Sequence, residues 1–332
     1  MEGPRMAHGD VSVIIPNYNR RNLVSRAIDS VLAQTHAPNE IIVVDDGSQD
    51  GSAEFLRHKY GNAIRLIEQE NGGASSARNR GIMESTADLI AFVDSDDVWD
   101  PDKLEIQVPL LQDPRVVLTY SNYRYENMEG DAFSDAGLSL SAEQTVFSNP
   151  IELLTRPGDS AVHLCGTLCR RKQLINVGMF DVNLRIAEDT KLFFNMAKQG
   201  AFAVTRRPLW TRQQISDDLQ LTTPWQESWH RNHADAVMDI LQDCWTDKSI
   251  DSVVARRNLR KLLAYFTLRQ AKFDALDGRF AAARRRAIQS IRYEPFRKTL
   301  AQSAIIALAP NMARRLIARR SAGRVSLRVG GR

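Results

Sequence analysis

Three carboxylates occupy four positions directly after a short apolar run. Residues 89–93 are Leu-Ile-Ala-Phe-Val, and Asp94, Asp96 and Asp97 follow. A short run of branched and aromatic residues predicts a buried strand, so the acids must lie just beyond its carboxyl end, the edge where open α/β sheets bind ligands. Clustered acids repel one another unless a cation lies among them, and hard oxygen ligands suit Mg²⁺ or Mn²⁺ holding a diphosphate.

Helix capping is the alternative explanation for these acids. Asp96 or Asp97 could cap a helix over residues 99–112, with Pro101 in its first turn. Capping accounts for one acid but not for three. The sequence therefore favours metal and phosphate binding.

The surrounding pattern predicts the elements that position these acids. Apolar strands are expected at residues 11–15, 41–44, 64–67 and 89–93, separated by helices that include residues 52–60 and 74–84. Such alternation of buried strands and helices is typical of a parallel sheet in an α/β fold. Tyr18, Asp46 and Asp94 each follow a strand, so we expect them to meet at one edge of the sheet.

The pattern is looser further along the chain. We expect a strand at residues 116–120, a loop at 126–144, an extended segment at 161–169 and a last strand at 202–208. Glu188 and Asp189 open an amphipathic helix that continues to Gly200. From residue 223 onward the chain is expected to be helical, with a short strand at 324–329.

Composition indicates an ordinary globular protein. Of the 332 residues, 43% are hydrophobic and 25% are charged. No apolar run approaches the ~20 residues of a spanning helix, and the first ten residues lack the features of a signal peptide. Three cysteines without zinc-site spacing indicate a reducing compartment, so we expect a cytoplasmic location.

The charge is distributed unevenly. The formal net charge is +4, but residues 251–332 hold 20 Lys and Arg against 4 Asp and Glu. This separation of an acidic part and a basic part predicts that they have different functions, and that the basic tail binds an anionic partner. Because the chain also becomes helical and Arg-rich from about residue 223, we place an α/β domain at residues 1–222 and a basic helical region at 223–332.

Two common nucleotide-binding motifs are missing, and a third pattern is present. The first strand is followed neither by G-x-G-x-x-G nor by a P-loop sequence. Instead the segments VSVIIPNYNR, IIVVDDGS, NGGASSARNRG and FVDSDD follow in order. Together, over about residues 10–215, they resemble the family 2 glycosyltransferases. The resemblance implies a GT-A fold with an open, mostly parallel sheet flanked by helices, and a nucleotide-sugar donor.

The resemblance implies roles at the donor base. Pro16 and Tyr18 would flank the base, with the Tyr18 ring stacked on it, and Asp46 would accept a hydrogen bond from a base that is typically uracil. The alternatives are a half-buried loop aromatic for Tyr18 and a turn or cap for Asp46.

The resemblance also implies roles at the diphosphate. Arg78 would bind the diphosphate, as suits a planar cation. Asp94 would lie near the ribose or the metal, and Asp96 would bind Mn²⁺ or Mg²⁺ directly. The alternative for Arg78 is a solvated helix-face arginine, which is what we expect of Arg80.

Glu188 and Asp189 resemble the acceptor-side Glu-Asp motif of this family. By position Asp189 would be the general base that takes the proton of the acceptor hydroxyl, and Glu188 would orient the acceptor. In-line attack with such a base inverts the anomeric configuration. The alternative is a pair of first-turn acids that complement the helix dipole. Many relatives place a histidine after the last strand, but Trp210 to Gln214 contain none.

The basic tail carries an apolar stripe with a spacing of four residues. A helix with this stripe beside basic positions suits an anionic membrane surface, and ordinary packing on the catalytic domain is the alternative. Nucleic acid is not expected as a partner, because no known nucleic-acid module or interleaved aromatic pattern is present. The stripe consists of Phe296, Leu300, Ala304, Leu308 and Met312.

These observations predict an inverting, metal-dependent glycosyltransferase at the inner face of the membrane. The donor would be a nucleotide diphosphate sugar, with UDP favoured, and the acceptor a glycan or lipid-linked glycan of the cell surface. The alternatives are a nucleotidyltransferase and a membrane-surface adaptor with a non-catalytic transferase-like domain. A nucleotidyltransferase would usually carry a Gly-rich basic loop where residues 16–20 lie.

Overall fold

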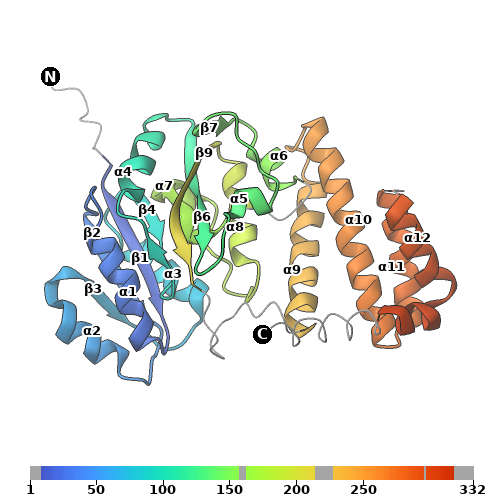
Figure 1. The fold of residues 1–332 in the computed structure, drawn as a ribbon, viewed down its shortest axis with the longest axis horizontal. Coiled ribbons are helices and arrows are strands. Elements are labelled where there is room, and N and C mark those ends of the chain that lie inside the picture. Colours follow the sequence, from blue (N-terminus) through green and yellow to red (C-terminus); the bar gives the residue numbers. More distant parts are fainter. Residues whose placement is uncertain (1–8, 157–161, 214–226, 295–296, 318–332) are drawn as a thin grey trace. The chain divides into compact units, whose positions relative to one another are not determined.

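The computed structural model describes residues 9–156, 162–213, 227–294 and 297–317. The chain divides into two compact units, residues 1–220 and 221–332. Figure 1 shows an α/β unit built on a sheet and a second unit made of helices. Each unit is described by itself below.

The first unit is built on one sheet. Among the described residues the sheet has nine strands in the order β3-β2-β1-β4-β8-β6-β9-β5, and β7 pairs with β9. The strands are β1 (Val11–Asn17), β2 (Glu40–Asp45), β3 (Arg65–Glu68), β4 (Leu89–Phe92), β5 (Val98–Trp99), β6 (Val116–Tyr125), β7 (Gln144–Phe147), β8 (Thr167–Arg170) and β9 (Ala201–Arg212).

The four N-terminal strands form the parallel half of the sheet. β1 pairs in parallel with both β2 and β4, and β2 pairs in parallel with β3. Their residues are buried on both faces in β1, β2 and β4, which explains the continuous apolar runs in the sequence. Parallel pairing places the residues after β1, β2 and β4 at one edge of the sheet, as expected for Tyr18, Asp46 and Asp94.

The other half of the sheet is mixed. β8 lies antiparallel between β4 and β6, and β9 runs parallel to β6 with three register shifts. β5 and β7 pair antiparallel with β9. The short strand β8 therefore brings the segment just before it, residues 162–166, next to the carboxyl end of β4.

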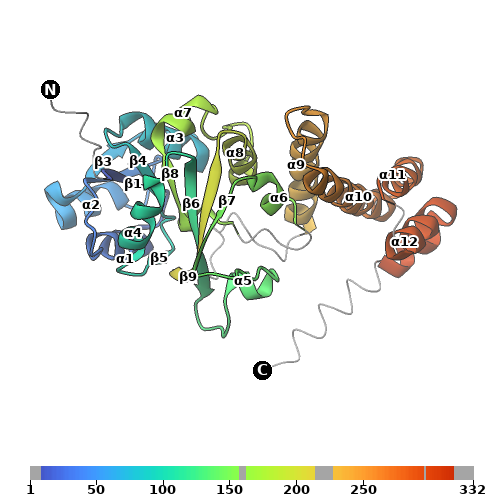
Figure 2. The ribbon, with the colours of Figure 1, turned by 90° about the horizontal axis from the view of Figure 1, so that it is seen from above.

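Helices cover both faces of the sheet. In Figure 2, α3, α7 and α8 lie on one face, and α1 and α4 lie on the other. The alternation of side chains along each strand supplies both interfaces: Val13 and Ile15 pack in the core with α1, whereas Ile42 and Val44 pack with Ala77 of α3. The helices are α1 (Arg21–Leu32), α2 (Ser52–Tyr60), α3 (Ala74–Glu84), α4 (Lys103–Gln107), α5 (Ala132–Asp135), α6 (Pro150–Leu154), α7 (Arg171–Asn176) and α8 (Glu188–Ala197), with 3₁₀ turns η1 (Gly61–Ala63), η2 (Val108–Gln112) and η3 (Leu164–Gly166).

The predicted helix over residues 99–112 is wrong in its first part. Trp99 belongs to strand β5, α4 begins only at Lys103, and its N-cap residue is Asp102. Asp96 and Asp97 therefore do not cap this helix, and capping no longer accounts for either acid. Two looser predictions are also refined: residues 126–144 contain α5, and the extended segment 161–169 contains η3 and the start of β8.

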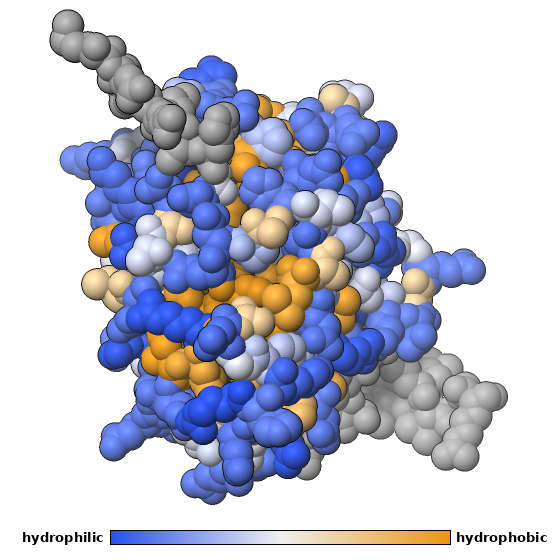
Figure 3. All heavy atoms as spheres, turned by 90° about the vertical axis from the view of Figure 1, so that its left-hand side faces the viewer, coloured by the Kyte–Doolittle hydropathy of each residue, from blue (hydrophilic) through white to orange (hydrophobic). Residues whose placement is uncertain are grey.

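The edge strand β3 is protected by charge. Figure 3 views the first unit from the side of α2 and β3, where hydrophobic residues form a band across a mainly hydrophilic face. Leu66 and Ile67 of β3 are half-buried, while Arg65 and Glu68 are exposed. Charged residues at both ends of a four-residue edge strand discourage pairing with another chain.

The second unit is helical. A buried carboxylate, Asp274, accepts hydrogen bonds from Arg279 and Arg286, which ties α10 to α11. None of the described helices is both long and apolar enough to cross a membrane. Phe296 and the predicted strand at 324–329 lie outside the described residues. The helices are α9 (Glu227–Thr246), α10 (Val253–Leu276), α11 (Phe280–Tyr293) and α12 (Arg297–Leu308), and residues 310–317 are also helical.

Candidate active site

Arg78 of α3 lies at the centre of the candidate site. Its Nη2 is 2.7 Å from Asp94 Oδ1, and its Nη1 is 3.0 Å from Glu188 Oε1. One buried guanidinium thus joins the loop after β4 to the start of α8. The solvated-arginine alternative is excluded for Arg78, whereas Arg80 is an exposed partner of Glu84, as expected.

The packing of α3 explains why Arg78 reaches this edge. Gly81 lets the helix lie close to β1, because a Cβ at this position would lie 2.5 Å from Ile14 Cγ2. The ring of Phe180 lies 5.4 Å from the Arg78 guanidinium carbon. The neighbouring Asn79 exchanges two hydrogen bonds with the Phe180 backbone, at 2.8 and 2.9 Å. The close packing of α3 on β1 and the ring of Phe180 therefore hold Arg78 in position.

The charges around Arg78 depend on one another. Burial favours neutral Asp94, but the Arg78 guanidinium outweighs it and holds the pKa of Asp94 below its ordinary value. Burial likewise opposes the charge of Arg78, yet Asp94 and Glu188 hold its pKa above the ordinary range. For Glu188, burial and the charge of Asp189 prevail and raise its pKa.

Asp96 has a different cationic partner. Its Oδ2 lies 2.8 Å from Nη1 of Arg20, the residue just before α1. Burial and the nearby charge of Asp94 raise the pKa of Asp96 despite this partner. The carboxylate therefore experiences an excess of negative charge, which a further cation would relieve.

A second group of side chains gathers behind Asp94. Asp94, Asp97, His163 and Cys165 each offer one ligand atom, and these four atoms lie within 4.8 Å of one another. Burial and the charges of Asp94 and Asp96 raise the pKa of Asp97 well above its ordinary value. Burial and the charge of Arg212 lower the pKa of His163 to about 4.

Asp189 lies in the first turn of α8. Ala187, just before the helix, has the left-handed backbone value φ 65°, which sets the direction in which α8 starts. The Oδ1 atom of Asp189 accepts a hydrogen bond of 2.6 Å from the Thr190 backbone N–H. Burial raises the pKa of Asp189, and the charge of Arg78 opposes this rise. A carboxylate with a raised pKa at a helix start is suited to accept a proton.

The expected base-binding residues lie at the carboxyl ends of β1 and β2: Pro16 within β1, Tyr18 just after it, and Asp46 just after β2. Asp46 is buried, and its carboxylate accepts hydrogen bonds from the backbone N–H groups of Gly72 and Gly73, at 2.9 and 2.7 Å, and from Gln69. It therefore holds the loop that leads into α3. Tyr18 is 41% exposed, so its ring is accessible for stacking, and Pro16 is half-buried.

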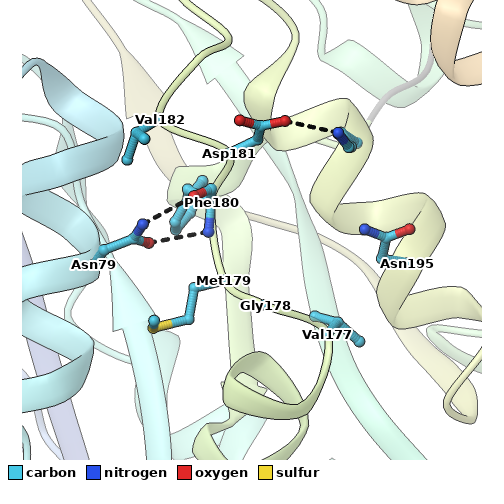
Figure 4. Close-up of a pocket in the computed structure, with 9 residues that line it drawn as sticks. Asn79, Val177, Gly178, Met179, Phe180, Asp181, Val182 and Asn195 are labelled. Carbon is cyan, nitrogen blue, oxygen red and sulfur yellow. Dashed lines mark hydrogen bonds and ion pairs between the residues drawn. The ribbon is translucent and has the colours of Figure 1, made fainter.

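A pocket opens between α3 and α8. Figure 4 shows Asn79 of α3 on one side, Asn195 of α8 on the other, and the loop of residues 177–182 between them. The pocket has a volume of about 360 Å³ and contains the Asp181–Lys191 ion pair, with Nζ and Oδ2 2.7 Å apart. It shares Phe180, the aromatic neighbour of Arg78, with the candidate site.

Sequence reasoning did not find three of these residues. Arg20 could have been noticed, because it follows the Pro-Asn-Tyr-Asn segment directly. His163 and Cys165 carry no local signal, since they reach Asp94 only through the antiparallel pairing of β8 with β4. Many relatives place a histidine after the last strand, where this chain has none, and the structure brings His163 to the site from an earlier segment.

The oxygen ligands at the open side of the site fit a hard divalent cation. Asp94 and Asp96 have side chains that are 26% and 20% exposed, so both can be reached from solvent. Such carboxylates, with positions left for water and phosphate, match the ligands of Mg²⁺ and Mn²⁺. Arg20 already contacts Asp96, so a cation there would share this carboxylate with Arg20 or displace it.

Replacing Arg78 by Met is expected to lower the free energy of unfolding at neutral pH by about 3 kcal/mol, the low end for breaking a buried pair, because two half-buried carboxylates lose their cation. The lowered pKa of Asp94 contributes stability above its ordinary pKa, and this stability is lost as the pH falls. The difference from wild type should therefore persist down to about pH 5 and shrink as the pH falls below about 4. Urea unfolding at neutral pH and at about pH 3 tests this.

The matched control is Arg80→Met, on the same helix. Arg80 forms an exposed pair with Glu84 at helical spacing, so its loss should cost about 0.5 kcal/mol or less. Equal effects of the two substitutions would contradict the bridging role of Arg78.

Comparison with known proteins places the chain in a family. The model of Glycosyl transferase family 2 matches residues 12–177. A putative teichuronic acid biosynthesis glycosyltransferase of Bacillus subtilis is 31% identical over 196 residues, 57% of this chain and 73% of that protein. A UDP-Glc:alpha-D-GlcNAc-diphosphoundecaprenol beta-1,3-glucosyltransferase of Escherichia coli is 37% identical over 118 residues, 35% of this chain and 47% of that protein.

Other matches are partial or concern the fold. The chain spans 31% of the length of an uncharacterized glycosyltransferase of Rickettsia felis, with 33% identity over 192 residues. S. aureus TarS 1–349 in complex with UDP has a TM-score of 0.64 at 17% identity, covering 93% of this chain and 91% of that one. A mannosyltransferase from Pyrobaculum calidifontis, in complex with GDP-Man and Mn²⁺, has a TM-score of 0.58 at 18% identity, covering 94% and 79%. These similarities confirm the expected GT-A fold, and the chain belongs to glycosyltransferase family 2.

Proposed function

We propose that this chain is an inverting, metal-dependent glycosyltransferase. It transfers a sugar from a nucleotide diphosphate sugar, with UDP favoured, to a hydroxyl of a glycan or lipid-linked glycan in cell-surface polysaccharide or glycolipid assembly. The bridge from Arg78 to Asp94 and Glu188 is the observation that carries the proposal. It joins the strand edge expected to hold the donor to the helix start expected to hold the acceptor.

The donor base is assigned to the ends of β1 and β2. Tyr18 offers an accessible ring, Pro16 borders it, and Asp46 is the acceptor at the neighbouring strand end. A carboxylate offers about four acceptor positions, and Asp46 uses three of them on Gln69, Gly72 and Gly73. One position therefore remains for an N–H of a base. The UDP complex of TarS is consistent with uracil.

The diphosphate is assigned to Arg78 together with Asp94 and Asp96. The two carboxylates would hold Mn²⁺ or Mg²⁺, with Asp96 as the direct ligand, and the planar Arg78 guanidinium would bind phosphate oxygens. When bound, the metal supplies neutralisation of the charge that develops on the leaving diphosphate. Since Arg78 is now paired with Asp94 and Glu188, donor binding redistributes its hydrogen bonds.

Proton transfer is assigned to Asp189. Its carboxylate lies in the first turn of α8, next to Glu188, which the Arg78 bridge fixes near Asp94. As general base it would take the proton of an acceptor hydroxyl that attacks the anomeric carbon opposite the diphosphate, which inverts the configuration. Glu188 would orient the acceptor. The acidic groups on both sides of Arg78 favour an enzyme over a non-catalytic adaptor, and family membership disfavours a nucleotidyltransferase.

The helical region is proposed to meet an anionic membrane at the cytoplasmic face, with residues 1–222 as the catalytic domain. Ile306, Ala313 and Ile317 pack in the core of the second unit. α12 and the helical residues 310–317 also carry exposed apolar residues, and Arg314 and Arg315 are exposed in the same stretch of sequence, a mixture that complements anionic lipid. Of the predicted stripe, Ala304 is half-buried, and the side chain of Leu300 is not described. The exposed apolar residues are Ile305, Leu308, Met312 and Leu316.

Asp96→Ala is expected to abolish the metal dependence of UDP binding, because it removes the direct ligand. UDP affinity is measured by calorimetric titration, once with Mn²⁺ and once with EDTA. In both conditions the variant should bind UDP only as tightly as wild type does in EDTA. Asp102→Ala, which removes a partly exposed carboxylate paired with Arg207, should leave the Mn²⁺ effect intact. Wild-type, metal-dependent affinity in Asp96→Ala would show that the metal is held elsewhere.

Asp189→Asn should retain donor binding and lose transfer by about 10²–10⁴-fold, because the amide cannot take a proton. Burial raises the pKa of Asp189, so wild-type transfer should rise with pH through a range above that of an ordinary aspartate. Asp181→Asn, which alters a carboxylate of the loop before α8 that pairs with Lys191, is the control and should change the rate little. Near-normal transfer by Asp189→Asn would assign the base to Glu188.

Leu308→Glu combined with Met312→Glu should weaken binding to anionic vesicles by more than about tenfold, since each buried apolar side chain contributes about 1.5–3 kcal/mol. Sedimentation with phosphatidylglycerol vesicles measures this, and high salt should release the wild type. The control is Val253→Glu, an 82% exposed apolar residue on α10. Binding that is unchanged in the double variant would refute the membrane proposal.

A further inference from the structure

Beside Asp94 lie three side chains that the proposed transferase reaction does not use, Asp97, His163 and Cys165. Asp94, Asp97, His163 and Cys165 come from two segments, the loop after β4 and the segment before β8. Asp97 and Cys165 are buried, while Asp94 and His163 are half-buried. Solvent can therefore reach the group at Asp94 and His163, whereas the Cys165 thiol and Asp97 are enclosed by the protein.

Several contacts fix these side chains in place. The Asp94 backbone N–H donates a hydrogen bond of 3.2 Å to Cys165 Sγ, and the Cys165 backbone N–H donates one of 3.4 Å to His163 Nδ1. The imidazole packs against the rings of Tyr123 and Trp210, with centroids 5.8 and 4.8 Å away. The backbone before β8 and two aromatic rings thus hold the histidine beside the carboxylates.

The donor atoms differ from those of the proposed catalytic cation. Two carboxylates, one imidazole and one thiol form a mixed oxygen, nitrogen and sulfur set. Mg²⁺ and Mn²⁺ prefer oxygen ligands, whereas a thiolate with histidine and carboxylate favours Zn²⁺ and similar cations in tetrahedral geometry. The four ligand atoms lie within 4.8 Å of one another, and ligands around one tetrahedral ion lie about 3.5 Å apart, so the group must contract by up to about 1 Å to surround it.

We propose that Asp94, Asp97, His163 and Cys165 form a binding site for a thiophilic divalent cation such as Zn²⁺, and that a cation bound there holds Asp94 and prevents donor binding. On binding, the Cys165 thiol releases its proton to solvent and its sulfur donates an electron pair to the metal, so no oxidant or reductant is needed. The inhibitory part rests on the proposed role of Asp94 at the donor. The binding part does not.

Cobalt spectroscopy on the metal-free full chain tests the binding part, because thiolate ligation of Co²⁺ produces an intense near-ultraviolet charge-transfer band. We expect this band in wild type and in Cys169→Ser, which alters another buried cysteine in β8. Cys165→Ser should bind Co²⁺ without the band. His163→Gln should bind Co²⁺ at least about tenfold more weakly, since even outer partners of a metal site contribute that much.

The opposite results would overturn the site. Absence of the band in wild type would refute the metal site and leave Cys165 as a buried thiol packed beside two carboxylates. A band that persists in Cys165→Ser would assign the thiolate to another cysteine. Circular dichroism verifies that each variant is folded, and the loss in His163→Gln gives a second reading that does not depend on the cysteine.

Titration of UDP with and without Zn²⁺ tests the inhibitory part. Equimolar Zn²⁺ should lower the UDP affinity of wild type and of Cys169→Ser by more than tenfold, and should have a much smaller effect on Cys165→Ser. Equal UDP affinity with and without Zn²⁺ in wild type would refute inhibition. Failure of wild type to bind UDP in any condition would instead refute the proposed donor, and the cobalt result would still stand.

Discussion

The buried guanidinium of Arg78 is the constraint on which the rest of the site depends. A buried cation must be paired, and here its partners come from the loop after β4 and from α8, two elements far apart in the chain. The pairing fixes Glu188 and the start of α8 relative to the strand edge that carries Asp94. Gly81, Asn79 and Phe180 hold the arginine in turn, so packing of α3 on the sheet determines the geometry of the site.

Arginines neutralise part of the negative charge of the site, but a surplus of negative charge remains. Arg78 stabilises the ionised form of Asp94, while Asp96 and Asp97 retain raised pKa values although Arg20 and Arg212 lie nearby. Cations of two kinds could relieve this surplus, a hard ion on the open side and a softer ion on the side of the thiol. Asp94 belongs to both sets, which connects the two parts of the site through one carboxylate.

Local patterns were sufficient for one half of the sheet and not for the other. The boundaries of α2 and α3 and the positions of the first four strands follow from apolar runs and turn residues, so the alignment of Asp46 and Asp94 at one edge was predictable. β5 and the late start of α4 were missed, because a two-residue strand has no periodicity. His163 joined the site through pairing of β8 with a strand more than seventy residues earlier, which no local pattern encodes. The roles of the individual site residues remain predictions.

The strand order also sets the sequence in which the two halves of the site can be assembled. β1 to β4 and the helices between them need only nearby segments, so the edge with Tyr18, Asp46 and Asp94 can form while the rest of the chain is still being synthesised. β6 can pair only after β8 and then β9 have been synthesised, and closing the long loops between these strands is slow. Asp94 therefore exists in a folded neighbourhood before Arg78 can contact Glu188. During that interval Arg78 can pair with Asp94 but not with Glu188, and the nascent chain exposes the unpaired flank of β4, an open strand edge of the kind that favours aggregation.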